Sequence, residues 1–109
     1  MDDPSLTIVW STAPDDAVAE QLARSLVEEE LAACVHVLAA GRSFYRWQGG
    51  LQRDAEAVLM IKTRTAVRER LVERLTELHP YEVPEILFTP VAGGAPAYLD
   101  WVRQMVPLG

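Results

Sequence analysis

The chain has 109 residues, of which 50% are hydrophobic and 24% are charged, and this composition is typical of one small globular domain, here spanning residues 1–109. Its formal net charge is -6 and its sequence has no cluster of basic residues, so we expect no binding to nucleic acid or to anionic membranes. No apolar run reaches the roughly 18 residues of a membrane span, the first residues are acidic, unlike a signal peptide, and the single cysteine cannot form an internal disulfide, so we expect a cytoplasmic protein.

Two elements are predicted before residue 31. Residues 5–12 alternate in polarity and predict a strand whose apolar face carries Leu6, Ile8 and Trp10. Pro14 ends this strand, and Asp15 is suited to cap a helix that runs to about Glu30. The helix is indicated by apolar side chains at helical spacing, namely Val18, Ala19, Leu22, Ala23, Leu26 and Val27.

A long β-hairpin is predicted next. Residues 34–38 favour a strand that continues past the small residues 39–41 to Gln48, and residues 51–63 predict its returning partner across a Gly49-Gly50 turn. At roughly 3.3 Å per residue the first strand would be about 50 Å long. A domain of this size has a diameter of roughly 35 Å. The strand must therefore bend near Gly41, project from the domain, or fold back on its own sheet.

The last third of the chain predicts two helices separated by a short strand. Thr63 or Thr65 can cap a helix with an apolar stripe, and Pro80 ends that helix at His79. The stripe consists of Val67, Leu71, Leu75 and Leu78. Residues 86–89 predict a strand closed by Pro90. Pro96 suits the first turn of a final helix that we expect to bury Leu99, Trp101, Val102 and Met105.

The order of these elements is β-α-β-β-α-β plus a terminal helix. It predicts an α+β protein of the ferredoxin-like, split β-α-β class, with two helices on one face of an antiparallel sheet. Yet residues 57–61 are apolar on both sides of their strand, and the hairpin carries the aromatic residues Phe44, Tyr45 and Trp47. Because a lone subunit would leave these groups in water, we expect a homo-oligomer in which the hairpins meet neighbouring copies.

Seven short segments support a closer comparison. They are Thr12-Ala13-Pro14, residues 26–29, residues 31–35, Tyr45-Arg46-Trp47-Gln48-Gly49, Ile61-Lys62-Thr63, residues 78–86 and Tyr98-Leu99-Asp100-Trp101. Together, and in this order, they resemble the CutA family, the divalent-cation tolerance proteins. The resemblance implies a ferredoxin-like subunit in a tight homotrimer, related in architecture to PII signalling proteins, and a link to tolerance of copper and other divalent cations.

The expected function is therefore divalent-cation tolerance or ion homeostasis, with weak binding of Cu²⁺ or another divalent cation. The alternative is a PII-like sensor of a small molecule, or a scaffold for a protein partner, that uses clefts between subunits. We expect no enzyme, because no serine has a histidine nearby in the sequence and the glycines lack the spacing of phosphate-binding loops.

Three residues are candidate metal ligands, since imidazole and thiolate suit copper and zinc. His79 matches the histidine of the family's His-Pro-Tyr segment, and its alternative role is to bind carbonyl groups at the helix end. Cys34 and His36 are two residues apart on a strand, so they point to the same side. Their alternative roles are a buried apolar thiol and a surface or interface imidazole.

A candidate ligand cleft is predicted where the hairpin of one subunit meets the next. Aromatic walls with a few convergent polar groups are typical of small-molecule sites. The residues proposed to line this cleft are Trp47, Lys62, Tyr81, Glu82 and Glu85, together with Glu56. The alternative is that Trp47 and Tyr81 only pack in an interface and that Lys62 pairs with a carboxylate.

Overall fold

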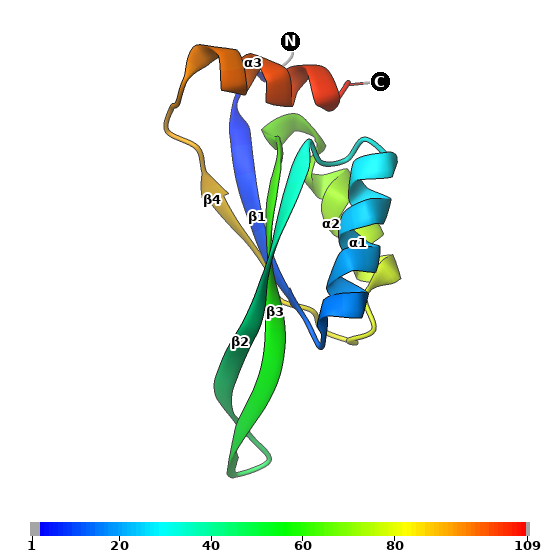
Figure 1. Ribbon diagram of the computed structural model, residues 1–109, viewed down its shortest axis with the longest axis vertical. Helices are drawn as coiled ribbons and strands as arrows, with labels where there is room; N and C mark the ends of the chain where they lie inside the picture. The colour runs from blue at the N-terminus through cyan, green and yellow to red at the C-terminus, as the bar shows by residue number, and fades with distance from the viewer. Residues whose placement is uncertain (1–2, 109) are drawn as a thin grey trace.

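The computed structural model describes residues 3–108 and confirms the α+β, ferredoxin-like order of elements (Figure 1). A single turn of 3₁₀ helix, η1 (Thr65–Val67), precedes the second α-helix. The strands and α-helices are β1 (Leu6–Ala13), α1 (Asp16–Glu28), β2 (Cys34–Trp47), β3 (Gly50–Arg64), α2 (Arg68–Leu78), β4 (Ile86–Pro90) and α3 (Pro96–Met105). None of the described helices is both long enough and apolar enough to cross a membrane.

The four strands form one antiparallel sheet in the order β2-β3-β1-β4, and α1 and α2 cover one of its faces (Figure 1). The main core lies between these two layers. Val9, Leu59 and Ile61 of the sheet are fully buried there, and so are residues of the two helices, among them Leu26, Leu71 and Leu75. The opposite side of the sheet, which α1 and α2 do not cover, is named the open face.

The apolar side that the sequence predicts for β1 faces away from α1 and α2 for most of the strand. Thr7, Val9 and Ser11 are buried on the helix-covered side, whereas Ile8 and Trp10 are only half-buried. The hydroxyl groups are tolerated inside because each is hydrogen-bonded, Thr7 Oγ1 to Thr65 Oγ1 at 2.7 Å and Ser11 Oγ to the carbonyl oxygen of Glu85 at 2.7 Å. The more apolar side of β1 therefore belongs to the open face.

Helix α1 begins as predicted, with the Asp15 carboxylate accepting a hydrogen bond from the Val18 amide at 2.8 Å. It ends at Glu28, earlier than predicted, because Glu30 adopts a left-handed conformation with φ of 60° and closes the helix. The amides of Glu30 and Leu31 then donate to the carbonyls of Val27 and Leu26, which is the pattern of a Schellman cap.

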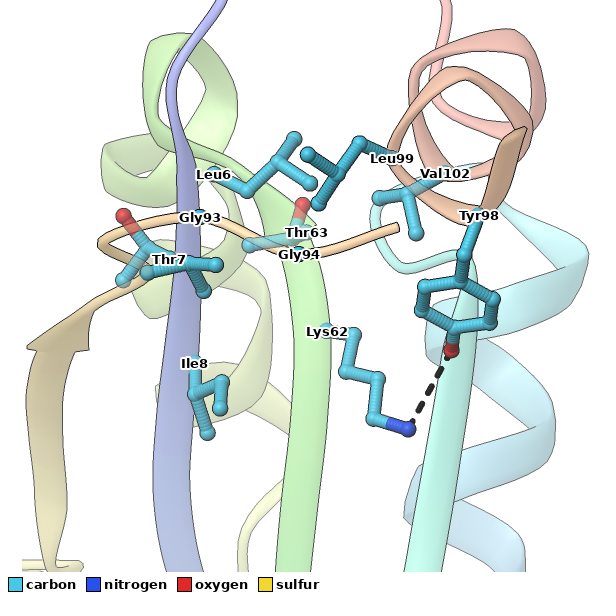
Figure 2. Close-up of a pocket in the computed structure, with 11 residues that line it drawn as sticks. Leu6, Thr7, Ile8, Lys62, Thr63, Gly93, Gly94, Tyr98, Leu99 and Val102 are labelled. Atoms are coloured by element: carbon cyan, nitrogen blue, oxygen red, sulfur yellow. Dashed lines mark hydrogen bonds between the residues drawn. The ribbon is translucent and has the colours of Figure 1, made fainter. Parts of the chain in front are cut away.

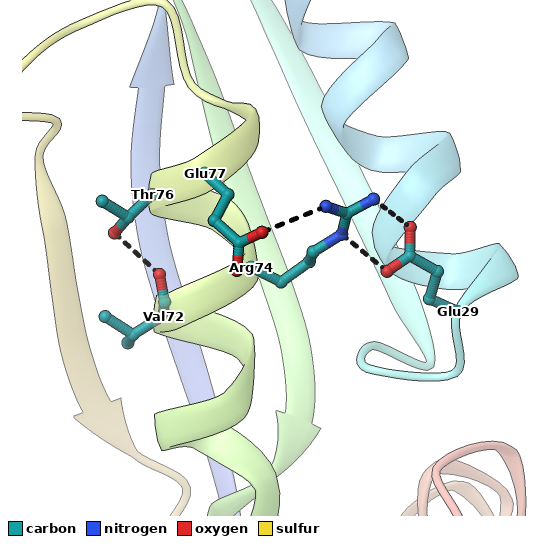
Figure 3. Close-up of polar contacts among 5 residues, drawn as sticks. All are labelled: Glu29, Val72, Arg74, Thr76 and Glu77. Atoms are coloured by element: carbon teal, nitrogen blue, oxygen red, sulfur yellow. Dashed lines mark hydrogen bonds and ion pairs between the residues drawn. The ribbon is translucent and has the colours of Figure 1, made fainter.

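The C-terminal end of α1 is tied to α2 by a charged pair (Figure 3). Arg74 of α2 binds both carboxylate oxygens of Glu29, through Nε at 2.8 Å and Nη2 at 3.1 Å. Its Nη1 also lies 3.5 Å from Glu77 Oε2 on the next turn. The guanidinium therefore offsets the negative charge that Glu29 brings to the negative end of the α1 dipole.

Strands β2 and β3 continue beyond the helices as a projecting ribbon, which gives the molecule a longest extent of 47 Å (Figure 1). Their pairing shifts register between Leu38 and Gly41. Of the predicted alternatives, projection from the domain is confirmed, while folding back on the sheet is wrong. A Cβ atom at Gly41 would lie only 2.8 Å from the Glu56 carbonyl oxygen. The turn is Gln48-Gly49, one residue earlier than predicted, and both residues have the positive φ of a type I′ turn, 50° and 80°.

Helix α3 crosses the end of the sheet (Figure 1) and contacts it through a narrow stripe. Val102 is fully buried and Leu99 packs beside it, as predicted, but Trp101 and Met105 are 38% and 41% exposed. The expectation that these two side chains are buried is wrong, because the helix rests on the domain along one side only. That side carries a second small core, made of Leu6, Ala33, Val67, Val102 and Val106.

Candidate functional site

The open face of the sheet is largely apolar. Trp10 lies opposite both Met60 and Leu87 in the register, and Leu38 lies opposite Val58. The side chains of Leu38 and Leu87 are 49% and 59% exposed. The sequence prediction of an unsheltered apolar sheet surface is therefore confirmed for the single subunit.

The projecting ribbon carries a second set of exposed apolar groups. Phe44 and Trp47 are 62% and 61% exposed, and Leu51 beyond the turn is 78% exposed. Such large side chains on an isolated two-stranded ribbon have no core of their own to pack against. The ribbon and the open face are thus two apolar surfaces that one copy of the chain leaves uncovered.

An open hollow of about 550 Å³ lies where the ribbon leaves the domain. Of the predicted cleft residues, Trp47, Glu56, Tyr81 and Glu85 meet here, whereas Glu82 does not line the hollow and Lys62 lines a separate pocket. The full lining is Thr12, Ser43, Phe44, Tyr45, Trp47, Asp54, Glu56, Tyr81, Val83 and Glu85. We call this site the acidic hollow, since its charged lining residues are all carboxylates.

Sequence reasoning missed Asp54 and Tyr45 at this site. Asp54 and Glu56 are two residues apart on β3 and so share one side of the strand. Tyr45 joins them because β2 pairs with β3 in a register that places Ser43 opposite Asp54. The spacing of Asp54 and Glu56 could have been recognised in the sequence. The shifted register beyond Gly41, which brings Tyr45 to them, could not.

Hydroxyl groups hold two of the three carboxylates of the acidic hollow, those of Asp54 and Glu56, in place. Glu56 accepts hydrogen bonds from the Ser43 hydroxyl and, at 3.2 Å, from the Tyr81 hydroxyl, while Tyr45 donates to Asp54. Burial and the neighbouring Glu56 charge raise the pKa of Tyr81 to about 12, and the hydrogen bond to Asp54 raises the pKa of Tyr45. Both phenols therefore stay protonated at neutral pH and donate to the carboxylates.

His79 anchors the segment that carries Tyr81. Its ring is 7% exposed, with Nε2 2.7 Å from the carbonyl oxygen of Thr12 and Nδ1 3.1 Å from the Tyr81 amide nitrogen. Because an amide donates and a carbonyl accepts, the neutral ring carries its proton on Nε2. A metal ion at His79 would have to replace one of these two bonds, and the role of His79 as a ligand stays a prediction.

Cys34 and His36 lie on the open face, Cys34 half-buried and His36 exposed. The register places Lys62 opposite Cys34 and Met60 opposite His36. Sequence reasoning missed Met60, whose thioether is a soft donor, because only the strand pairing brings it beside the histidine. Within residues 3–108, no three or more His, Cys, Asp or Glu side chains are grouped as a metal site would require.

Comparisons with known proteins agree with this architecture. Residues 7–105 match the family described as CutA1 divalent ion tolerance protein. The chain is 47% identical over 97 residues to the divalent-cation tolerance protein CutA of Thermus thermophilus, covering 89% of this chain and 94% of that protein. It is 45% identical over 96 residues to the protein of the same name in Pectobacterium atrosepticum, covering 88% and 87%.

The fold also closely matches that of a solved structure. The crystal structure of CutA1 from Oryza sativa matches with a TM-score of 0.94 and 36% identity, and the match covers 96% of each chain. The relatives are named for tolerance of divalent cations and not for a reaction. The chain therefore belongs to the CutA1 divalent ion tolerance protein family.

Proposed function

We propose that this protein serves divalent-cation tolerance by weak, reversible binding of divalent cations in the acidic hollow. The observation that supports the proposal is the pair of carboxylates on Asp54 and Glu56, which share one side of β3 in a hollow whose lining contains no basic residue. Their negative charge attracts cations, and carboxylate oxygens bind many divalent ions. Weak binding follows because two carboxylates leave the remaining coordination positions to water or to a neighbouring subunit.

Calorimetry on the assembled protein tests this proposal. We expect measurable heats of binding with Mn²⁺, Zn²⁺ and Cu²⁺. The affinity for each ion should fall at least tenfold when Asp54→Asn and Glu56→Gln are combined. The matched control is Glu69→Gln with Glu73→Gln, which changes the net charge equally on the exposed surface of α2. Equal losses in both double variants would mean that only net charge matters and would refute the site.

A second candidate site concerns copper alone. Cys34 and His36, with Met60 opposite the histidine, offer a thiol, an imidazole and a thioether on one face, and soft sulfur ligands favour Cu(I). We expect Met60→Leu and His36→Ala each to weaken Cu(I) binding measured by competition with a chelator. Met105→Leu on α3 is the control, and an affinity unchanged by the first two substitutions would exclude this site.

We also propose that three copies assemble through the open face and the ribbon, so that the protein's own chain is its first partner. The exposed apolar groups on both surfaces support this, because burying them is the main favourable term in association. Leu87→Lys, on the open face, should lower the sedimentation mass to that of a monomer. Val27→Lys, at an exposed position on α1, should not, and a wild-type monomer at high dilution would refute the assembly.

The alternative proposal is a PII-like sensor or scaffold, in which clefts between subunits hold a small molecule or a protein partner. Exposed Trp47 and Tyr81 beside carboxylates support it, since aromatic walls with few polar groups suit such ligands. Under either proposal the protein binds and does not catalyse. A thermal-shift screen with nucleotides and metabolites tests the alternative, and a uniform lack of stabilisation would count against it.

The proposed compartment is the cytoplasm. Cys34 is a free thiol, and a chain with one unpaired cysteine suits a reducing environment. Fractionation of cells expressing the untagged protein tests this placement, and recovery outside the cytoplasmic fraction would overturn it.

A further inference from the structure

A separate pocket of about 170 Å³ lies between α3, the segment of residues 91–94 and strands β1 and β3 (Figure 2). Its walls are mainly aliphatic and aromatic, formed by Leu6, Ile8, Val91, Tyr98, Leu99 and Val102. Gly93 and Gly94 pass along one side, where they add no side chain. The pocket shares no residue with the acidic hollow and is a separate site.

The two threonines in the lining contribute no free polar group. Thr7 Oγ1 is hydrogen-bonded to Thr65 Oγ1 at 2.7 Å, and Thr63 Oγ1 donates to the carbonyl oxygen of Leu31 at 2.6 Å. The hydroxyl groups that belong to the sheet are therefore already satisfied. A ligand in this pocket would meet an apolar surface along most of its length.

Polar character is confined to one end, where Lys62 meets Tyr98 (Figure 2). Lys62 Nζ donates to the Tyr98 hydroxyl oxygen at 3.2 Å and lies 5.3 Å from the centre of its ring. Because the lysine is the donor, the tyrosine keeps its own proton for another acceptor. Among the residues that the structure describes, no carboxylate lies within 4.0 Å of the Lys62 ammonium, since it takes part in none of the ion pairs.

The size and chemistry of the pocket define a ligand class. A cavity of about 150 Å³ holds one benzene ring, so this pocket has room for a single six-membered ring and little more. Two adjacent donors, one of them cationic, suit the two oxygens of a carboxylate. A phosphate or a sugar would leave most of its polar atoms against aliphatic walls, which is costly.

We propose that this pocket binds a small aromatic carboxylate of the size of benzoate. The ring lies among Ile8, Leu99 and Val102, and the carboxylate accepts hydrogen bonds from Lys62 Nζ and the Tyr98 hydroxyl. The site combines residues of β1, β3 and α3, so only the folded chain forms it.

Lys62 provides a direct probe, because it is the only lysine of the chain. Protein labelled with ¹³Cε-lysine gives a single side-chain resonance, which is followed by NMR as benzoate is added to the native assembly. We expect a saturable shift with a Kd below about 1 mM. Benzyl alcohol, which keeps the ring and loses the charge, should bind with an affinity at least tenfold lower in the same titration. No saturation with benzoate, or equal binding of benzyl alcohol, would overturn the proposal.

Calorimetry with benzoate on substituted proteins tests whether Lys62 and Tyr98 both contribute to binding. Lys62→Met keeps the apolar stem without the charge and should weaken binding at least tenfold, while Tyr98→Phe should weaken it about threefold. The control is Arg24→Met, which removes a positive charge from α1, a helix that contributes no residue to the pocket. Unfolding curves of each variant confirm that it folds. Unchanged affinity in Lys62→Met, or an equal loss in Arg24→Met, would refute the site.

Discussion

His79 and Thr12 are joined by a hydrogen bond of 2.7 Å between the imidazole Nε2 and the backbone carbonyl oxygen, although 67 residues separate them in the sequence. The other ring nitrogen accepts from the Tyr81 amide at 3.1 Å. One buried imidazole thus connects the end of β1 to the segment that presents Tyr81 to the acidic hollow.

The first prediction concerns this histidine. His79→Ala leaves the Thr12 carbonyl and the Tyr81 amide without their partner, and an unsatisfied buried polar group costs about 1–3 kcal/mol. We expect a loss of this size in the free energy of unfolding, measured with urea. Glu82→Ala, at an exposed position outside the acidic hollow, should change it by less than about 0.5 kcal/mol. A loss of Cu²⁺ binding in His79→Ala with unchanged stability would instead identify His79 as a metal ligand.

The second prediction is a pH dependence at Glu29. The hydrogen bonds from Arg74 lower the pKa of Glu29 below its ordinary value of 4.5. A lowered folded-state pKa means that the pair stabilises the fold above pH 4.5 and that this contribution is lost as the pH falls through the folded-state pKa. Glu29→Gln should therefore lower stability at pH 7 and make no difference in strong acid.

Denaturant unfolding across this pH range checks the second prediction. Glu20→Gln is the control, because the Glu20–Arg24 pair is more exposed than Glu29–Arg74 and is screened more by solvent. A stability difference between wild type and Glu29→Gln that persists unchanged in strong acid would contradict the role given to this pair.

The third prediction concerns the close backbone approach at Gly41. Gly41→Ala places a methyl group 2.8 Å from the Glu56 carbonyl oxygen, which is closer than a Cβ atom can remain, so the ribbon must shift. Overpacking of this kind costs about 1–3 kcal/mol. Gly93→Ala is the matched control, since a Cβ atom there meets nothing within 4 Å. Thermal unfolding should show the loss only for Gly41→Ala, and equal effects would contradict the explanation.

The fourth prediction is a gain in stability at the end of α1. Glu30 has φ of 60°, a left-handed conformation that costs a non-glycine residue roughly 1–2 kcal/mol. Glu30→Gly should therefore raise the free energy of unfolding by about 1 kcal/mol. Gln21→Gly, at an exposed position inside the same helix, should lower it by about 1 kcal/mol. A Glu30→Gly protein that is less stable than wild type would show that the side chain has another role.

Much of the fold was predictable because its signals are local. The Asp15 cap depends on residues three positions apart, and the helix end before Pro80 depends on the residue that precedes the proline. The position of the turn was missed by one residue, since Gly49-Gly50 and Gln48-Gly49 are both plausible from composition. Only the pairing of Trp47 with Gly50 selects the second.

The candidate site was predicted in part. Trp47, Tyr81 and Glu85 do meet, but Lys62 was assigned to the same cleft and lies elsewhere. Glu56 and Lys62 share one side of β3, yet six residues of a strand span about 20 Å, too far for one small pocket. Tyr98, the partner of Lys62, is 36 residues away in the sequence, so no local pattern indicated their contact.

The sequence by itself determined the order of the elements, the cap of α1, the length of the ribbon and the excess of apolar surface, because periodicity and backbone sterics act between near neighbours. Tertiary structure alone decided which side of β1 is buried. Thr7 and Ser11 face the core because their hydroxyl groups find partners 58 and 74 residues away, at Thr65 and Glu85. A polar group can be buried only where a distant hydrogen-bond partner meets it, and that meeting exists only in the folded chain.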